Sequence, residues 1–240
     1  MADPIMWPLD KLVPANPQPY LQPFNTQGGR NALGRGQVVG NAPPRWRVIL
    51  GDITLMSDDQ IRAFRATADQ CNGMSNPICV PLCDKARGPV PVINGKKTYS
   101  LPEIGFDDGL GFDDGLGFDD NSAFGGSVWA SSGTDVVAGA VSLQIVMEFG
   151  SAIEAGMIFS HGYEYAYAIR SVTSANTSGA FAVYTVTVWP PLRAEITAST
   201  LLNFDNPHVR CTLETDDAMA MPALELWRIG KATVPFIEDV

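Results

Sequence analysis

Residues 180–189, Ala-Phe-Ala-Val-Tyr-Thr-Val-Thr-Val-Trp, decide the fold class of this chain. β-Branched and aromatic side chains dominate the stretch and predict a β-strand. Because both faces of this strand are apolar, we expect a central strand or one that a partner covers. Pro190 and Pro191 follow directly and should end the strand rigidly, which would hold Leu192 and Arg193 at a fixed exit.

Alternating apolar and polar residues predict further strands around this one. The clearest patterns cover residues 141–149, 163–170 and 208–214. In the second pattern Tyr163, Tyr165 and Tyr167 recur at every other position. They should share one side of a strand and face a core, a glycan or a neighbouring subunit.

The C-terminal residues are expected to form a β-hairpin. Residues 224–229 and 232–237 are both largely apolar, and Gly230-Lys231 lies between them as the expected turn. Pro235 should mark the last strand as an edge strand or a bulged strand, because proline cannot donate to a ladder.

One helix is expected, near residues 58–71. Ser57 precedes Gln60 by three residues, which is the spacing of a capping box, and Asn72-Gly73 supplies the stop. The apolar stripe that should face the core comprises Ile61, Phe64, Ala68 and Cys71. This stripe predicts packing rather than cofactor binding.

The N-terminal segment differs in composition from the rest. Residues 1–44 are rich in Pro, Gly, Asn and Gln, and we expect an extended arm that gains order by lying on another surface. Regular structure should begin with a strand over residues 45–54. The predicted fold is therefore mainly β. It is an antiparallel sandwich-like or barrel-like domain over residues 45–240 with one short α-helix.

Composition narrows the classes of function. The 240 residues are 45% hydrophobic and 18% charged, with 26 acidic against 16 basic residues and a net charge of −10. An acidic chain repels a phosphate backbone, so specific nucleic-acid binding is not expected. The best apolar run, residues 136–147, stops at Glu148 and is too short to cross a membrane. We expect a soluble chain made in a cytoplasm, without membrane insertion.

The hexamer Gly-Phe-Asp-Asp-Gly-Leu occurs twice in tandem, at residues 105–110 and 111–116. A degraded third copy follows at residues 117–122. The acids of the two complete copies, Asp107, Asp108, Asp113 and Asp114, are weak candidates for calcium ligands. They lack a bidentate Glu and the spacing of a calcium loop. A surface loop lengthened by duplication is the favoured interpretation.

Catalytic patterns are absent from the sequence. It has no Gly-x-Ser-x-Gly elbow, phosphate-binding loop or dinucleotide fingerprint. His161 could belong to a nucleophilic triad, but a His beside Gly at a strand end is more often a turn residue. His208 is expected to face solvent. Adjacent acidic pairs should point in different directions, unlike the opposed acids of a glycosidase. We predict a protein that is not an enzyme, with no cofactor.

Four cysteines could in principle hold a metal or form disulfides. They are Cys71, Cys79, Cys83 and Cys211. No Cys-x-x-Cys pair or nearby His completes a zinc site, so reduced thiols, buried or half-buried, are expected.

Several short motifs resemble a family of bacteriophage tail proteins. They are Gly156–Ser160, Tyr167–Val172, Trp189–Ala194, Phe204–Pro207 and, upstream, Trp46-Arg47, the capped helix and Asn76–Asp84. Over residues 45–240 the chain is similar to the distal tail proteins, or related minor tail proteins, of long-tailed (siphovirus-type) phages.

The resemblance implies a virion protein of the phage tail, assembled in the host cytoplasm. Family members form a homo-oligomeric ring, six-fold here by expectation, that joins the tail tube to the baseplate or tail-tip hub. The implied partners are further copies of the chain, the tail tube protein, the hub or baseplate proteins and the tape measure protein. The family is not enzymatic, so the resemblance implies no catalytic residues.

The candidate interface residues follow from this expectation and from the strand pattern. They are Tyr165, Trp189, Pro190, Pro191 and Arg193. Arg193 is the best candidate for an ion pair between elements or between subunits, because its guanidinium suits carboxylates and acids are abundant. The alternative function is a carbohydrate-binding module of a tail or cell-surface receptor-recognition complex, which would bind sugars through exposed aromatic side chains.

Overall fold

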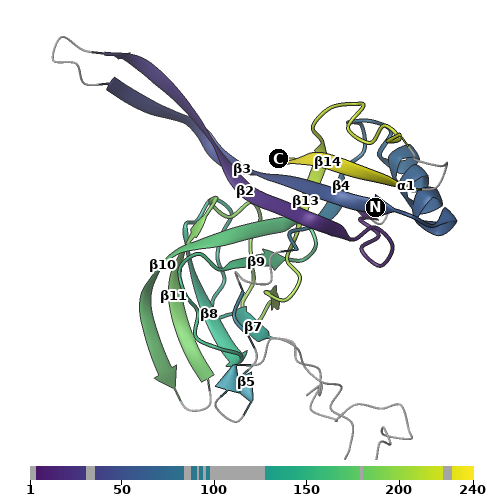
Figure 1. Ribbon diagram of the computed structural model, residues 1–240. Helices are drawn as coiled ribbons and strands as arrows, with labels where there is room; N and C mark the ends of the chain where they lie inside the picture. The colour runs from purple at the N-terminus through teal and green to yellow at the C-terminus, as the bar shows by residue number, and fades with distance from the viewer. Residues whose placement is uncertain are drawn as a thin grey trace, which may run out of the picture.

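The computed structural model describes residues 4–30, 36–83, 88–90, 92–93, 96–97, 128–178, 181–223 and 229–240. Within them lie two six-stranded sheets, a short pair of strands, β5 (Val92–Ile93) and β6 (Lys96–Lys97), and one α-helix (Figure 1). The predicted fold class is confirmed: the chain is mainly β, with a sandwich-like or barrel-like arrangement and one helix.

The first sheet contains the N-terminal hairpin, and we call it the hairpin sheet. Its strands lie in the order β1 (Ile5–Met6), β4 (Ile78–Pro81), β13 (His208–Leu213), β14 (Gly230–Glu238), β3 (Gly36–Leu55) and β2 (Pro14–Arg30). The β1–β4 pair is parallel and the other pairs are antiparallel. Strand β14 therefore links strands from the beginning of the chain to strands from its middle and end.

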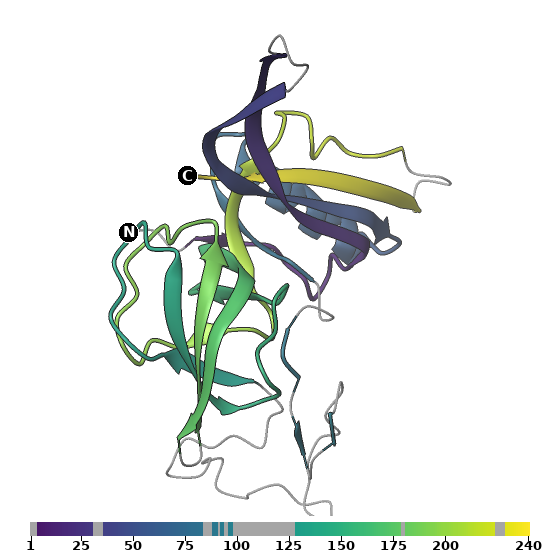
Figure 2. The ribbon, with the colours of Figure 1, turned by 90° about the vertical axis from the view of Figure 1, so that its left-hand side faces the viewer.

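The second sheet curls into a nearly closed barrel, and we call it the barrel sheet. Its order is β12 (Leu202–Asn203), β9 (Ile158–His161), β10 (Tyr165–Ser178), β11 (Phe181–Trp189), β8 (Ser142–Phe149) and β7 (Trp129–Ser132). An isolated bridge between Ser131 and Leu201 brings its two edges together. In both views the hairpin sheet lies across one end of this barrel (Figures 1 and 2).

Strand β11 has the central position that its sequence predicts, between β10 and β8. Tyr184, Val186 and Val188 point into the barrel and are buried. The alternate residues, from Phe181 to Trp189, lie on the outer face and are half-buried or exposed. The second apolar face of this strand is therefore largely at the outside of the described molecule.

The helix α1 (Asp58–Cys71) covers the core of the hairpin sheet and has the predicted bounds. The Gln60 backbone N–H donates to Ser57 Oγ at 3.2 Å, and the Ser57 N–H donates to Gln60 Oε1 at 3.1 Å, so the capping box is complete. Asn72 ends the helix in the left-handed conformation, with φ 47°. Ile61, Phe64 and Cys71 are buried, as expected; Thr67 is buried beside them and donates to the Ala63 carbonyl.

Strands β2 and β3 form a long hairpin that projects from the body (Figure 1). Near the body, β3 also pairs with β14, from Leu55 to Arg47. Beyond Arg47 the described part of β3 pairs with β2 alone, along residues 36–46. We call this two-stranded part, residues 22–30 of β2 and 36–45 of β3, the ribbon.

The N-terminal segment is part of the hairpin sheet. Residues 4–30 and 36–44, where an extended arm was expected, supply β1, β2 and the start of β3. Trp7 and Leu12 are buried in the core of this sheet, and the Trp7 indole N–H donates to the Leu12 carbonyl at 2.9 Å. The segment gains its order from the chain's own strands.

The C-terminal hairpin was predicted wrongly. Gly230 and Lys231 lie inside β14, opposite Leu55 and Thr54, and do not form a turn. Strand β14 is internal, so Pro235 does not mark an edge, but the register shift between Ala232 and Val234 agrees with the other alternative, a bulged strand. Its ladder with β13 covers only residues 236–238, so Pro235 sits where that ladder ends, just after a register shift in the β3 ladder. A proline fits there because no donor to β13 is needed.

The tyrosine pattern also differs from its prediction. Tyr163 lies in the turn before β10 and is 56% exposed, whereas Tyr165 is half-buried and Tyr167 is fully buried in the barrel core. The strand begins two residues later than the alternation suggests. Only Tyr165 and Tyr167 therefore share one side of it, and that side faces the core.

Candidate functional site

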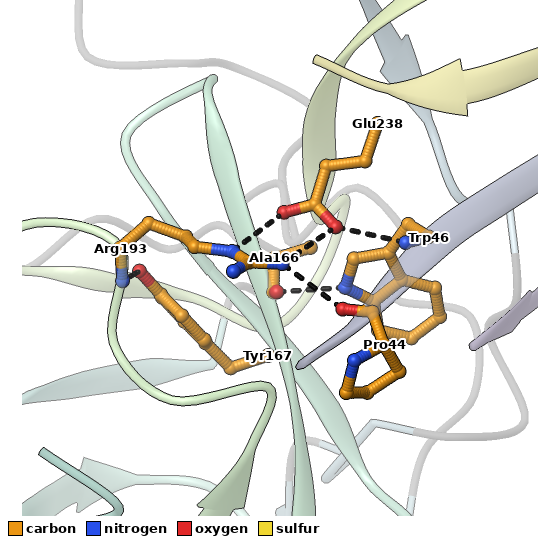
Figure 3. A network of polar contacts seen from close by, with 6 residues as sticks. All are labelled: Pro44, Trp46, Ala166, Tyr167, Arg193 and Glu238. Atoms are coloured by element: carbon orange, nitrogen blue, oxygen red, sulfur yellow. Dashed lines mark hydrogen bonds and ion pairs between the residues drawn. The ribbon is translucent and has the colours of Figure 1, made fainter. Parts of the chain in front are cut away.

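A buried ion pair lies where the hairpin sheet meets the barrel sheet (Figure 3). Arg193, in the loop after β11, donates from Nε to Glu238 Oε1 at 3.1 Å and from Nη2 to the Pro44 carbonyl at 2.9 Å. The side chains of Arg193 and Glu238 are 13% and 2% exposed. Of the two kinds of ion pair expected for Arg193, the structure contains the one between elements of the same chain.

The remaining polar groups around this pair are also satisfied. Glu238 Oε2 accepts from the Trp46 backbone N–H at 2.8 Å, and the Trp46 indole donates to the Ala166 carbonyl at 2.7 Å. The Arg193 backbone N–H donates to the Tyr167 hydroxyl at 2.9 Å. Burial raises the pKa of Tyr167 to about 12, so this hydroxyl stays protonated at neutral pH. We call this group of residues the clamp.

The clamp joins strands from both sheets. Trp46 and Pro44 belong to β3 and Glu238 to β14, whereas Ala166 and Tyr167 belong to β10. Because its donors and acceptors are paired with one another, the clamp has the properties of a structural joint. Breaking a buried pair leaves an uncompensated charge, which typically costs about 3–5 kcal/mol.

A groove of about 720 Å³ lies beside the clamp, between the base of the ribbon and strands β10 and β11. We call it the ribbon-base groove. It is lined by Leu21, Pro23, Phe24, Asn25, Gly40, Ala42, Pro43, Pro44, Ala168, Arg170 and Trp189. Most of this lining is apolar, and the walls come from both sheets.

Two arginines stand over the aromatic rings of this groove. The Arg170 guanidinium lies 5.7 Å from the Trp189 ring centroid, and the Arg45 guanidinium lies 5.8 Å from that of Phe24. Within the described part of the chain, neither arginine forms an ion pair with a carboxylate. Of the two, Arg170 lines the groove. An apolar groove bordered by this cation suits a ligand that combines an apolar body with an anionic group.

The structure distributes the predicted interface residues over different environments. Trp189 lines the ribbon-base groove and is half-buried; Pro190 is buried and Pro191 is half-buried. Tyr165 packs against the barrel core, and Arg193 belongs to the clamp. Trp189 is thus the candidate on an accessible concave surface. The calcium candidates, Asp107, Asp108, Asp113 and Asp114, lie outside the described residues.

The two histidines are not solvent-facing. His208 is only 8% exposed, contrary to prediction, and its Nδ1 lies 2.7 Å from the Asn206 carbonyl while Tyr163 packs edge-on against its ring. His161 ends β9 and is half-buried, and its buried Nδ1 has no hydrogen-bond partner among the described residues. Burial lowers the pKa of both imidazoles.

The four cysteines form no disulfide. Cys71, Cys79 and Cys211 are buried, whereas Cys83 is half-buried. Burial raises the pKa of Cys71 and of Cys79 to about 11 and that of Cys211 well above its ordinary value. Among the described residues, no group of three or more His, Cys, Asp or Glu side chains could hold a metal ion.

Sequence reasoning missed most of the clamp and the ribbon. Glu238 follows Phe236 at strand spacing, so a carboxylate at a core-facing position was an available signal for a buried partner of Arg193. The prolines of β2 obscure the alternation that would have predicted the ribbon, although the Gly28-Gly29 pair near the end of β2 favours a turn nearby.

Comparisons with known proteins add no family. No protein-family model matches the chain, and no curated protein matches it in sequence. In the described residues no helix has the length and apolar character needed to cross a membrane.

Proposed function

We propose that this chain is a structural subunit of a phage tail. In this proposal it forms a closed homo-oligomeric ring, with six copies expected, at the distal end of the tail. The ring joins the tail tube to the baseplate or tail-tip hub and has no catalytic role. The tail location comes from the motif resemblance over residues 45–240, and the self-assembly is supported by the fold.

The ribbon is the observation that carries the self-assembly. A two-stranded hairpin alone in water is only marginally stable and needs a third strand or an apolar cover. Along residues 36–46, β3 lacks the second neighbour that β14 gives it nearer the body. A projecting ribbon of this kind is well suited to lie on an adjacent subunit, which would supply the missing contacts.

The prolines of β2 direct where such a contact can form. Pro14, Pro17, Pro19 and Pro23 lie in this edge strand, and proline cannot donate to an added strand. The prolines thus hinder the pairing of a further strand along the body, whereas residues 24–30 contain no proline. Strand addition by a neighbour is accordingly favoured on the outer part of the ribbon.

The net charge of the chain agrees with a position beside the channel through which phage DNA passes. At −10, the chain would repel the phosphate backbone, so DNA could pass a ring of such subunits without adhering. The clamp would keep the two sheets of each subunit in a fixed relation, which a closed ring requires of every copy.

Light scattering on the purified chain, followed by electron microscopy of the same peak, tests this proposal. A ring with a mass near six subunits supports it. A chain that stays monomeric, and that also forms no ring when mixed with tail tube and hub proteins, contradicts it.

The ribbon-base groove supports a second candidate function, that of a carbohydrate-binding module. Trp189 and Phe24 are aromatic side chains in a groove, which is a common way to stack sugar rings. Screening the chain on a glycan array tests it. Saturable binding that Trp189→Ala abolishes would favour this candidate, whereas a ring that binds no glycan would favour the tail subunit.

A further inference from the structure

The outer face of strand β11 connects two surfaces of opposite charge, one at each end of the strand. At its C-terminal end, Trp189 lines the ribbon-base groove with the Arg170 guanidinium above its ring. At its N-terminal end, Phe181 is 46% exposed. Both side chains belong to the alternate residues that point away from the barrel core.

An acidic residue accompanies the exposed ring of Phe181. Ala182 of β11 pairs with Met147 of β8, so Phe181 and Glu148 are neighbours at the same end of the two strands. Glu148 is exposed, and Phe149 beside it is 37% exposed. Within the described part of the chain, Glu148 forms no ion pair. We call Glu148 and Phe181 the barrel foot.

We propose that the ribbon-base groove receives the barrel foot of a second copy of this chain, with Glu148 of the foot facing Arg170 of the groove. The foot combines an apolar ring with a carboxylate, and the groove combines apolar walls with the Arg170 guanidinium. Charge complementarity of this kind fixes the orientation of two partners as they meet. This inference rests on the proposed self-assembly and names a second contact within it, beside the contact made by the ribbon.

The contact is between two molecules and runs head to tail. Strand β11 is nine residues long, which places groove and foot roughly 25 Å apart in one copy, so a foot cannot fill its own groove. A contact between unlike surfaces leaves one groove and one foot free on every dimer. It therefore propagates until a ring closes or a filament grows.

Arg170→Glu reverses the charge that Arg170 gives the groove, and Glu148→Arg reverses the charge of the foot. Both residues are exposed, so both variants are expected to fold, which circular dichroism verifies. Each variant should raise the concentration needed for assembly by about tenfold or more, measured by light scattering. Matched charge reversals at exposed sites elsewhere, Arg65→Glu on α1 and Glu154→Arg, should assemble like the wild type.

Mixing the two variants gives the sharpest result. In the mixture each foot meets a groove of opposite charge only on the other variant, so the mixture should regain assembly with the two variants alternating. A chain carrying both reversals should regain assembly, because the opposite charges then face each other again with their signs exchanged. Recovered assembly of the mixture, from two variants that each fail to assemble alone, is a result that misfolding of either variant would not produce.

The apolar part of the contact has its own test. Phe181→Ser should weaken assembly, whereas Val137→Ser, at a side chain that is 72% exposed, should leave it unchanged. If both charge reversals and Phe181→Ser assemble like the wild type, this contact is overturned while the ring remains. A wild-type chain that is monomeric at its highest soluble concentration also overturns the contact, and electron microscopy with tail tube and hub proteins then decides the tail function separately.

Discussion

Arg193 and Glu238 form a buried ion pair that fastens the hairpin sheet to the barrel sheet, with Nε 3.1 Å from Oε1. The pair is enclosed by hydrogen bonds from Trp46 to Glu238 and from Arg193 to Pro44. Its stabilising value depends on both partners, since either charge alone would be buried without compensation.

Arg193→Ala should therefore lower the free energy of unfolding by about 3–5 kcal/mol, measured by urea denaturation. Arg210→Ala is the control, because the Arg210 side chain is 38% exposed and its pairs with Glu164 and Asp239 should contribute less than about 1 kcal/mol. Replacing both clamp charges together, as Arg193→Met with Glu238→Leu, should cost less than Arg193→Ala alone. Equal losses for Arg193→Ala and Arg210→Ala would contradict the structural role of the clamp.

The capping box of α1 should contribute measurably to stability. Ser57→Ala removes the acceptor for the Gln60 N–H and should cost about 1 kcal/mol. Gln60→Ala removes the acceptor for the Met56 and Ser57 N–H groups. A double-mutant cycle of the two substitutions, followed by urea denaturation, should show coupling, because each side chain binds the backbone of the other residue. Strict additivity would mean that the box contributes nothing as a unit.

Thiol reactivity should be low in the folded chain. Cys71, Cys79 and Cys211 are buried, and burial raises the pKa of each thiol, so little thiolate forms at pH 8. With Ellman's reagent we expect rapid reaction of at most Cys83, and of all four thiols after denaturation. Cys83→Ser should remove the rapid phase. Rapid reaction of two or more thiols in the native state would contradict the described core.

Stability should fall as the pH drops below about 6.5. Burial lowers the pKa of His208 and of His161, so the unfolded chain binds protons in a range where the folded chain does not. The stabilising contribution is complete above the unfolded pKa and is lost as the pH falls toward the folded pKa. Urea denaturation between pH 7.5 and about 5 measures this slope while most carboxyls remain ionised. His208→Gln should make the slope shallower, and an unchanged slope would contradict the burial of a neutral imidazole.

Local patterns predicted the local structure well. The capped helix and the central position of β11 depend on residues close in sequence, such as Ser57 with Gln60, and both predictions were confirmed. The clamp depends on Trp46 and Glu238, which are 192 positions apart, so no local periodicity could pair them. His208 alternates like a surface residue, but the turn that carries Tyr163 covers it. The proposed interface stays a prediction, because it involves residues of another molecule.

The insertion of β14 between β13 and β3 has a consequence for the order of folding. The β2–β3 hairpin can form early, but β14 lies between this hairpin and β13 in the sheet. The Trp46 backbone N–H can donate to Glu238 only after β14 has been added. Closing contacts of such long sequence separation is slow. A newly made chain should therefore hold an incomplete hairpin sheet until β14 docks. Because the same step completes the joint between the two sheets, subunits would become competent to associate only after their own folding has finished.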